Sequence, residues 1–438
     1  MASHSSSFPP LSLFGSRDGS QREMRVFSPT HRGLLDAAAR GWYATWCERA
    51  YCPWSDHAMI DPDSLERLSA ELRERMADDK KLLDELRNEV RPLRAATRRI
   101  QPRSATAISL VGTDGGNNRI EFDPFMAQLV RVVDSSANEY CLEVVTPTTN
   151  TEDLSRKQFD ASGDPVTALG ELMAYLGVGH LWNLTPMIQR PSGEPAKPSW
   201  VQVYREIVEW AILFKLVRTK DFGTDTLIVV DGFLRSKVFK GDLFARLRQG
   251  LEEAIQRQER ESRRRIFLAG IAKHSKVLQR YRLAMVLEGI MDHDYSCYVE
   301  IPRQLEEKAY VWSEYARGDE REQEGGEANK FVAGKMFFVK FGSRRRDPIW
   351  AIDLFQPQAS KAQEVLGYLL ADSVDGFPVP FYPRCLQRAH ENAALVDFDM
   401  DILQQGIFSA IRNSLANDAP ILDTFRLAGG DPSSRRYS

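Results

Sequence analysis

Asp114 and Asp231 each follow an apolar run and precede a glycine, in Ala107-Ile-Ser-Leu-Val-Gly-Thr-Asp-Gly-Gly116 and Thr226-Leu-Ile-Val-Val-Asp-Gly232. Aliphatic runs of this length that stop at glycine predict buried strands, so each aspartate is expected at a strand end. If the two strands are neighbours in one sheet, their carboxylates can hold Mg²⁺ or Mn²⁺ for phosphoryl transfer. The pattern therefore predicts a metal-dependent nuclease.

Asp-Gly is also a common turn signal, so either aspartate alone could serve only to cap a turn. Its occurrence after two strongly apolar strands favours the metal-site interpretation and leaves the turn interpretation open.

A third acid is expected on the helix predicted at 201–218, which carries Glu206 and Glu209 on one face. Glutamate on a helix is usually only a solvated charge. Glu209 lies among Val208, Trp210 and Ala211, an apolar setting that favours it as the metal ligand, although Glu206 stays an alternative.

The order of elements predicts an RNase H-like α/β fold, a mixed sheet with flanking helices and an N-terminal helical extension. Runs at 107–113, 120–122, 126–133 and 139–145 describe an antiparallel meander, followed by helices near 165–177 and 201–218 and the Asp231 strand. We expect a disordered tail at 1–22, a helical extension at 23–100, a nuclease domain at 101–425 and a flexible tail at 426–438.

The extension contains a predicted helix at 34–50 and a long amphipathic helix or hairpin from Leu65 to about Arg99, which begins after Asp61-Pro-Asp-Ser64. Its apolar stripe could pack on its own domain or on a second copy or partner.

The net charge gives no sign of a nucleic-acid partner, because 58 basic and 61 acidic residues leave the chain at −3. Any phosphate-binding surface must therefore come from local clusters of basic residues. Candidate clusters are Arg246, Arg248, Arg257, Arg260, Arg263–Arg265 and Arg344–Arg346, whereas 318–327 is an acidic loop.

The five cysteines are scattered along the chain, which favours reduced thiols over disulfides. Cys47, Cys52 and His57 resemble zinc ligands but lack a fourth ligand of suitable spacing. We expect a cytoplasmic protein without a membrane span or signal peptide.

Short motifs in a specific order resemble the NurA nuclease family from about residue 105 to about 415. They are Asp114-Gly, the acidic helix, Val230-Asp-Gly-Phe-Leu234, Ile271-Ala-Lys-His-Ser-Lys276, Gly376-Phe-Pro-Val-Pro-Phe-Tyr382 and Ala389-His390. The chain departs from the family at Gly116, where serine is usual, and at Phe377, where tyrosine is common.

The resemblance implies a manganese-dependent DNA nuclease, with Mg²⁺ as a possible substitute, that acts as a homodimer docked on a hexameric HerA-type ATPase. It implies metal ligands at Asp114, Glu209, Asp231 and His390, and further catalytic residues at Lys273 and Tyr382. From chemistry alone, Lys273 could face the phosphate or only hold a carboxylate, and a lone histidine is more often a packing residue.

Two functions of different class remain open. One is an active DNA nuclease that works with the ATPase in DNA repair or in antiviral defence against phage. The other is an idle RNase H-like module that caps or regulates the ATPase. The sequence does not decide between repair and defence, the polarity of cleavage, the strand preference, or whether activity needs the ATPase.

Overall fold

The structure is a computed structural model of the whole chain, and it describes residues 61–104, 109–122, 125–146, 148–188, 200–310, 330–394 and 397–415. From Asp114 to the end of its strand only the backbone is described. The predicted tails, the helix at 34–50, the cysteine pair near His57 and the acidic loop at 318–327 lie outside the described residues. The chain forms two compact units, Met1–Met76 and Ala77–Ser438, and the sheet lies in the second.

A nine-stranded mixed sheet runs through this unit, in the order β1-β7-β8-β9-β6-β5-β2-β3-β4. Its strands are β1 (Arg98–Arg99), β2 (Ser109–Phe122), β3 (Phe125–Asp134), β4 (Glu139–Val145), β5 (Thr226–Asp231), β6 (Ile266–Ala272), β7 (Cys297–Glu300), β8 (Gly334–Lys340) and β9 (Ile349–Phe355).

The predicted mixed α/β fold is confirmed by the pairing of five of these strands. The strands β2, β3 and β4 form the antiparallel meander, and β5 and β6 then lie parallel to β2 on its other side. The order β4-β3-β2-β5-β6, with helices between β4, β5 and β6, is the RNase H-like arrangement.

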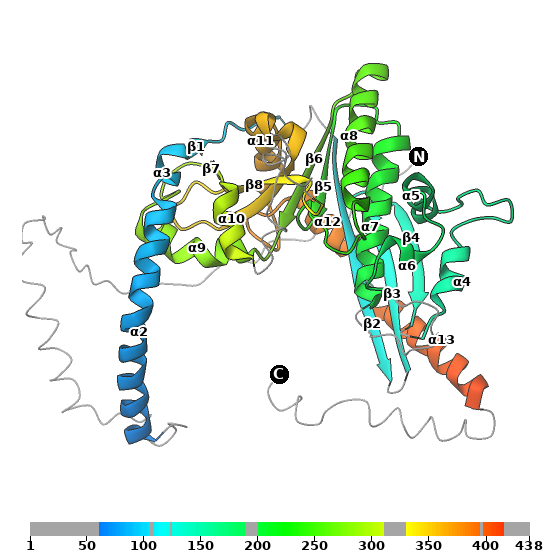
Figure 1. Cartoon of the computed structure of the whole chain (residues 1–438), viewed down its shortest axis with the longest axis horizontal. Helices are drawn as coiled ribbons and strands as arrows, with labels where there is room; N and C mark the ends of the chain where they lie inside the picture. Colours follow the sequence, from blue (N-terminus) through cyan, green and yellow to red (C-terminus); the bar gives the residue numbers. More distant parts are fainter. Residues whose placement is uncertain are drawn as a thin grey trace, which may run out of the picture. The chain divides into compact units, whose positions relative to one another are not determined.

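Helices cover both faces of the central strands, with α5 (Ala168–Leu176), α7 (Trp200–Thr219) and α8 (Leu243–Glu261) on one face and α11 (Ala362–Ser373) and α12 (Arg384–Ala393) on the other (Figure 1). Further helices are α4 (Thr151–Arg156), α6 (Leu181–Leu184), α9 (Lys276–Leu287), α10 (Arg303–Ala309), the 3-10 helix η5 (Gln356–Lys361) and α13 (Asp397–Leu415). The helices predicted near 165–177 and 201–218 are thus confirmed as α5 and α7. None of the described helices combines the length and apolar character that a membrane span requires.

Successive side chains of the central strands point to opposite faces of the sheet, and this explains why helices cover both faces. On β5, Ile228 packs with α5, α7 and α8, whereas Leu227 and Val229 pack with α11 and α12. Because successive strand residues point to opposite faces, a run that is apolar throughout needs an apolar layer on each side. Asp231 continues the Leu227 and Val229 series, which places it on the α12 side.

The prediction that Asp114 ends a strand at a glycine turn is wrong. The strand β2 continues through Gly115 and Gly116 to Phe122, and all these residues pair with β3, with Asp114 opposite Val133. The short run at 120–122 is therefore the far end of β2. What ends near Asp114 is the parallel pairing with β5, whose last partners are Thr113 and Val230.

The long helix predicted from Leu65 is α2 (Pro62–Val90), which ends nine residues earlier than predicted (99 − 90) and is followed by the single turn α3 (Leu93–Ala96). Asp61 accepts a hydrogen bond from the Ser64 amide at 3.1 Å, which satisfies one of the free amides at the helix start.

Candidate active site

Asp231, Lys273 and Tyr382 meet at the carboxyl edge of the sheet. The Lys273 ammonium lies 2.6 Å from Asp231 Oδ2, and the Tyr382 hydroxyl donates to Asp231 Oδ1 at 3.1 Å. The Tyr382 side chain is buried, and its ring packs against Trp350 at 4.9 Å between centroids. The carboxylate is thus oriented through both oxygens, while its own side chain keeps 18% of its surface exposed.

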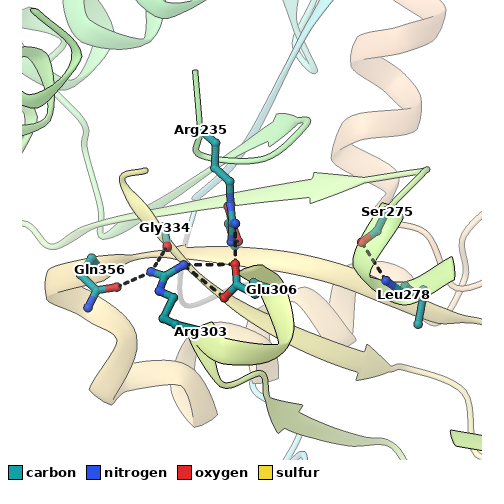
Figure 2. Close-up of polar contacts among 8 residues, drawn as sticks. Arg235, Ser275, Leu278, Arg303, Glu306, Gly334 and Gln356 are labelled. Carbon is teal, nitrogen blue, oxygen red and sulfur yellow. Dashed lines mark hydrogen bonds and ion pairs between the residues drawn. The ribbon is translucent and has the colours of Figure 1, made fainter. Parts of the chain in front are cut away.

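Local sequence explains how Lys273 reaches this place. The strand β6 ends at Ala272, and α9 begins at Lys276, so Lys273 lies in a loop of three residues. Ser275 closes this loop as the helix cap, because its hydroxyl accepts from the Leu278 amide at 3.2 Å (Figure 2). On β5, the turn after Asp231 uses Gly232 at φ +141°, a conformation that favours glycine.

Asp114 occupies the backbone position beside Asp231. Thr113 of β2 pairs with Val230 of β5 in parallel register, and the next residue on each strand is an aspartate. The structure therefore brings the two aspartates to equivalent places on neighbouring strands, which is the condition that the sequence analysis set for a shared metal site.

His390 lies on α12, which packs directly on β2. A Cβ on Gly112 would lie 2.3 Å from the carbonyl oxygen of Cys385, so only glycine lets this helix approach so closely. At the other end of α12, the Asn392 side chain donates to the carbonyl of Asp134 at 3.1 Å, and Asp134 is the β3 partner of Thr113. These two contacts hold α12 along the strand that carries Asp114, with His390 exposed near its end.

The two acids of α7 differ in their surroundings. Glu206 is partly buried and accepts a hydrogen bond from the Ser236 hydroxyl at 2.5 Å, and burial raises the pKa of its carboxyl despite that hydrogen bond and the nearby Lys237 and Arg205. Glu209 is one third exposed and pairs with Arg205 of its own helix at 3.3 Å. Of the two, Glu206 contacts the segment that follows Asp231.

That segment is held by a buried charge network (Figure 2). Arg235 is fully buried and makes two hydrogen bonds to Asp353 of β9, at 2.7 and 2.8 Å, and an ion pair with Glu306 of α10. Arg303 also binds Glu306, at 3.1 and 3.2 Å, and donates to the carbonyl of Gly334 at 2.6 Å. The backbone adds a bridge between Arg235 and Val332. The loop after Asp231 is therefore fixed to two other elements.

Part of the predicted basic cluster on α8 has a structural use. Arg246 donates to the carbonyl of Leu176 at 2.9 Å, Arg257 to that of Arg218 at 2.7 Å, and Arg265 pairs with Asp225 and Glu364. The Arg344–Arg346 group lies in the turn between two paired strands, β8 and β9.

Among the side chains that the structure describes, no three of His, Cys, Asp or Glu gather closely enough to hold a metal ion. The Asp114 side chain is outside that set. Sequence reasoning missed Trp350 and the partners of Arg235, because neither has a motif of its own. A tryptophan at the start of a strand gave no signal, and Arg235 finds Asp353 118 residues away.

Comparisons with known proteins give weak matches only. No protein-family model matches the chain, and no curated protein does. The NurA nuclease from Sulfolobus solfataricus is 11% identical over 81% of this chain and 98% of that chain, with a TM-score of 0.39. NurA bound to dAMP and manganese is 13% identical over 77% and 94%, with a TM-score of 0.31. These values are too low to assign the chemistry of the site.

Proposed function

We propose that this protein is a divalent-metal-dependent nuclease that hydrolyses phosphodiester bonds in DNA. The observation that carries the proposal is the pairing of Thr113 with Val230, which puts Asp114 and Asp231 side by side on two central strands. A lysine and a buried tyrosine already bind the second carboxylate. An RNase H-like sheet with acids at this point suits metal-assisted phosphoryl transfer.

The donor atoms fit a hard divalent cation. Asp114 and Asp231 would hold it through carboxylate oxygens, joined by an acid of α7 and by His390, whose imidazole would favour Mn²⁺ over Mg²⁺. An ionised carboxylate has about four lone-pair sites, so Asp231 can bind a cation while it accepts from Lys273 and Tyr382. When bound, the ion would activate a water and offset negative charge on the phosphate.

The chain's own residues orient the site. Tyr382 and Lys273 hold the Asp231 carboxylate in one direction, and the Lys273 ammonium, with its side chain 39% exposed, places positive charge where a phosphate would arrive. Lys273 could therefore both hold the Asp231 carboxylate and face the phosphate, the two roles considered for it from the sequence. Figure 2 shows the network that fixes the loop after Asp231, so the site stands on rigid elements.

The choice between Glu206 and Glu209 can be tested by stability as well as by activity. Because burial raises the pKa of Glu206, the folded state favours its protonated form, and the stability due to that preference is lost as pH rises through the raised pKa. Glu206→Gln mimics the protonated form. We expect wild-type stability at low pH, a higher thermal midpoint than wild type at pH 8 in EDTA, and activity lower by about a hundredfold.

Glu209→Gln is the matched control for that experiment. It removes an ion pair between neighbouring turns of one helix, worth about 0.3–0.5 kcal/mol. Stability and activity should stay near wild type at both pH values. The reverse pattern, with activity lost only in Glu209→Gln, would restore Glu209 as the ligand.

His390→Ala is expected to keep the fold and lose activity. His390 is exposed, so its truncation should change the free energy of unfolding by about 0.5 kcal/mol at most. Cleavage with Mn²⁺ should fall more than cleavage with Mg²⁺, because the imidazole favours manganese. Arg388→Ala, exposed on the same helix, is the control. Normal cleavage by a folded His390→Ala would remove the histidine from the site.

The same motif resemblance leads us to propose a homodimer that works with a HerA-type hexameric ATPase. In support of a second copy, Leu65, Leu68 and Leu72 of α2 are exposed by 50, 44 and 48%. Light scattering of the purified protein, alone and mixed with the ATPase, tests both interactions. A monomer in both samples would contradict them.

A further inference from the structure

The turn between β8 and β9, residues 341–348, carries three consecutive exposed arginines, Arg344, Arg345 and Arg346. We refer to it as the arginine turn. It leaves the sheet at the same edge as the candidate site, because Ala351 at the start of β9 pairs with Ala272 at the end of β6, and Ile271 of β6 pairs with Asp231. Neighbouring strands are about 4.8 Å apart, so the turn lies roughly 10–14 Å from β5 along this edge.

The backbone of the arginine turn is fixed. The Arg344 amide donates to Asp347 Oδ2 at 2.7 Å, and a Cβ on Gly342 would collide with that same carboxylate oxygen. Below it, the fully buried Lys340 donates to the carbonyl of Arg344 at 3.1 Å and to the carbonyl of His293. A buried ammonium therefore joins the arginine turn to the segment that contains His293.

This neighbouring segment supplies aromatic surface. His293 and Tyr295 stack with 4.7 Å between ring centroids and an angle of 6°, and the Arg99 guanidinium lies 5.3 Å from the Tyr295 ring centroid. Both rings are half-buried and Arg99 is exposed. The Ser296 hydroxyl donates to the carbonyl of Phe341 at 2.6 Å, which adds a second link to the arginine turn.

The side chains of the three arginines make little contribution to the stability of the fold. Arg345 approaches Asp292 at 3.7 Å, with both side chains exposed, and such a pair contributes little. Within the described part of the chain, Arg344 and Arg346 have no ion-pair partner. Asp294 and Asp347 lie in the same two loops, but the Asp347 carboxylate is engaged by the Arg344 amide.

Cations on a fixed backbone beside stacked aromatic rings are typical of surfaces that bind single-stranded nucleic acid, where phosphates meet arginine and bases stack on rings. An acidic protein surface would use the arginines but would not need the rings. We infer that the arginine turn, Arg99 and Tyr295 bind a nucleic-acid strand that runs along this edge of the sheet toward Asp231. This inference rests on the proposed function and names the path of its substrate.

The test measures binding and chemistry separately. Arg344→Ala/Arg345→Ala/Arg346→Ala is made in an Asp231→Asn background, and binding of a fluorescent single-stranded 30-mer oligonucleotide is followed in EDTA over a range of salt concentrations. We expect affinity to fall at least about tenfold and the salt slope to decrease by about 2, as for three lost phosphate contacts on a single strand. The triple lysine variant should keep the slope.

Two further variants separate charge from stacking. Tyr295→Ala should weaken binding by about tenfold without changing the salt slope, and Tyr295→Trp should restore it. Arg156→Ala/Lys157→Ala removes exposed cations at the end of α4, which follows β4 at the other edge of the sheet, and should bind as the parent does. Thermal midpoints of the arginine variants should match the parent, whereas Tyr295→Ala removes a half-buried ring that packs on the core and should melt lower, so its binding is measured well below its midpoint. Unchanged affinity and slope in the triple alanine variant would overturn the inference.

A small phosphodiester distinguishes failure of this inference from failure of the proposed function. With Asp231 intact and Mn²⁺ present, the triple alanine variant should hydrolyse bis(p-nitrophenyl) phosphate at the wild-type rate, because that ester does not reach the arginine turn. If the wild type cleaves neither the ester nor DNA, the proposed function fails. The binding comparison above still decides whether the arginine turn holds a strand.

Discussion

Asp231→Asn should abolish metal-dependent cleavage of linear DNA, with a loss of about a thousandfold or more. The reason is that a divalent ion contributes several kcal/mol of charge stabilisation, and each 1.36 kcal/mol is tenfold in rate. The amide keeps the size of the side chain and can still accept from Tyr382, so the fold should persist. The measurement is nuclease activity with Mn²⁺ and with EDTA, alongside the thermal midpoint.

Asp225→Asn offers a matched control for Asp231→Asn. Asp225 also borders β5, but at its start, where it binds Arg265 at 2.7 Å. Its replacement should cost some stability and leave activity intact, because it lies at the other end of the strand. Unchanged activity in Asp231→Asn would remove the metal site from this edge of the sheet and favour the idle module.

Arg235→Met should lower the free energy of unfolding by about 3–5 kcal/mol, the usual cost of removing one partner from a buried ion pair. Arg235, Asp353 and Glu306 are all fully buried, and burial raises the pKa of Glu306 even with two arginines beside it. Without Arg235, the Asp353 carboxylate loses its two hydrogen bonds. Denaturant unfolding followed by fluorescence measures the change.

Arg156→Met is the control for the buried pair. Arg156 pairs with Asp153 on the surface, with side chains 67 and 53% exposed, so its loss should be close to neutral. Arg235→Lys should lie between the two, because a lysine keeps the charge but not the two-pronged geometry. A loss below about 1 kcal/mol in Arg235→Met would show that the network is not what holds the loop after Asp231.

Local patterns predicted the strands of the meander, the Asp231 strand and the helices α5 and α7, in the order in which the structure has them. The β5 run and its glycine, the caps of α2 and α9, and the α12 helix after Pro383 depend on residues close in sequence. Such signals act over a few residues, so they can be recognised in the sequence without knowledge of the tertiary structure. They placed Asp114 and Asp231 on two apolar strands, and the pairing of β2 with β5 decided that these strands are neighbours.

Long-range packing decided the rest. The strand β2 passes through Gly115 and Gly116 because β3 pairs with it, and this pairing overrides the turn preference of Asp-Gly. Glu206, rather than Glu209, contacts Ser236 only because α7 lies against the loop after Asp231. Gly112 matters because α12, more than 270 residues later, lies on it (385 − 112). Arg235 can be buried only because Asp353 and Glu306, from distant parts of the sequence, form ion pairs with it. The spacing of residues within a local segment cannot predict such contacts.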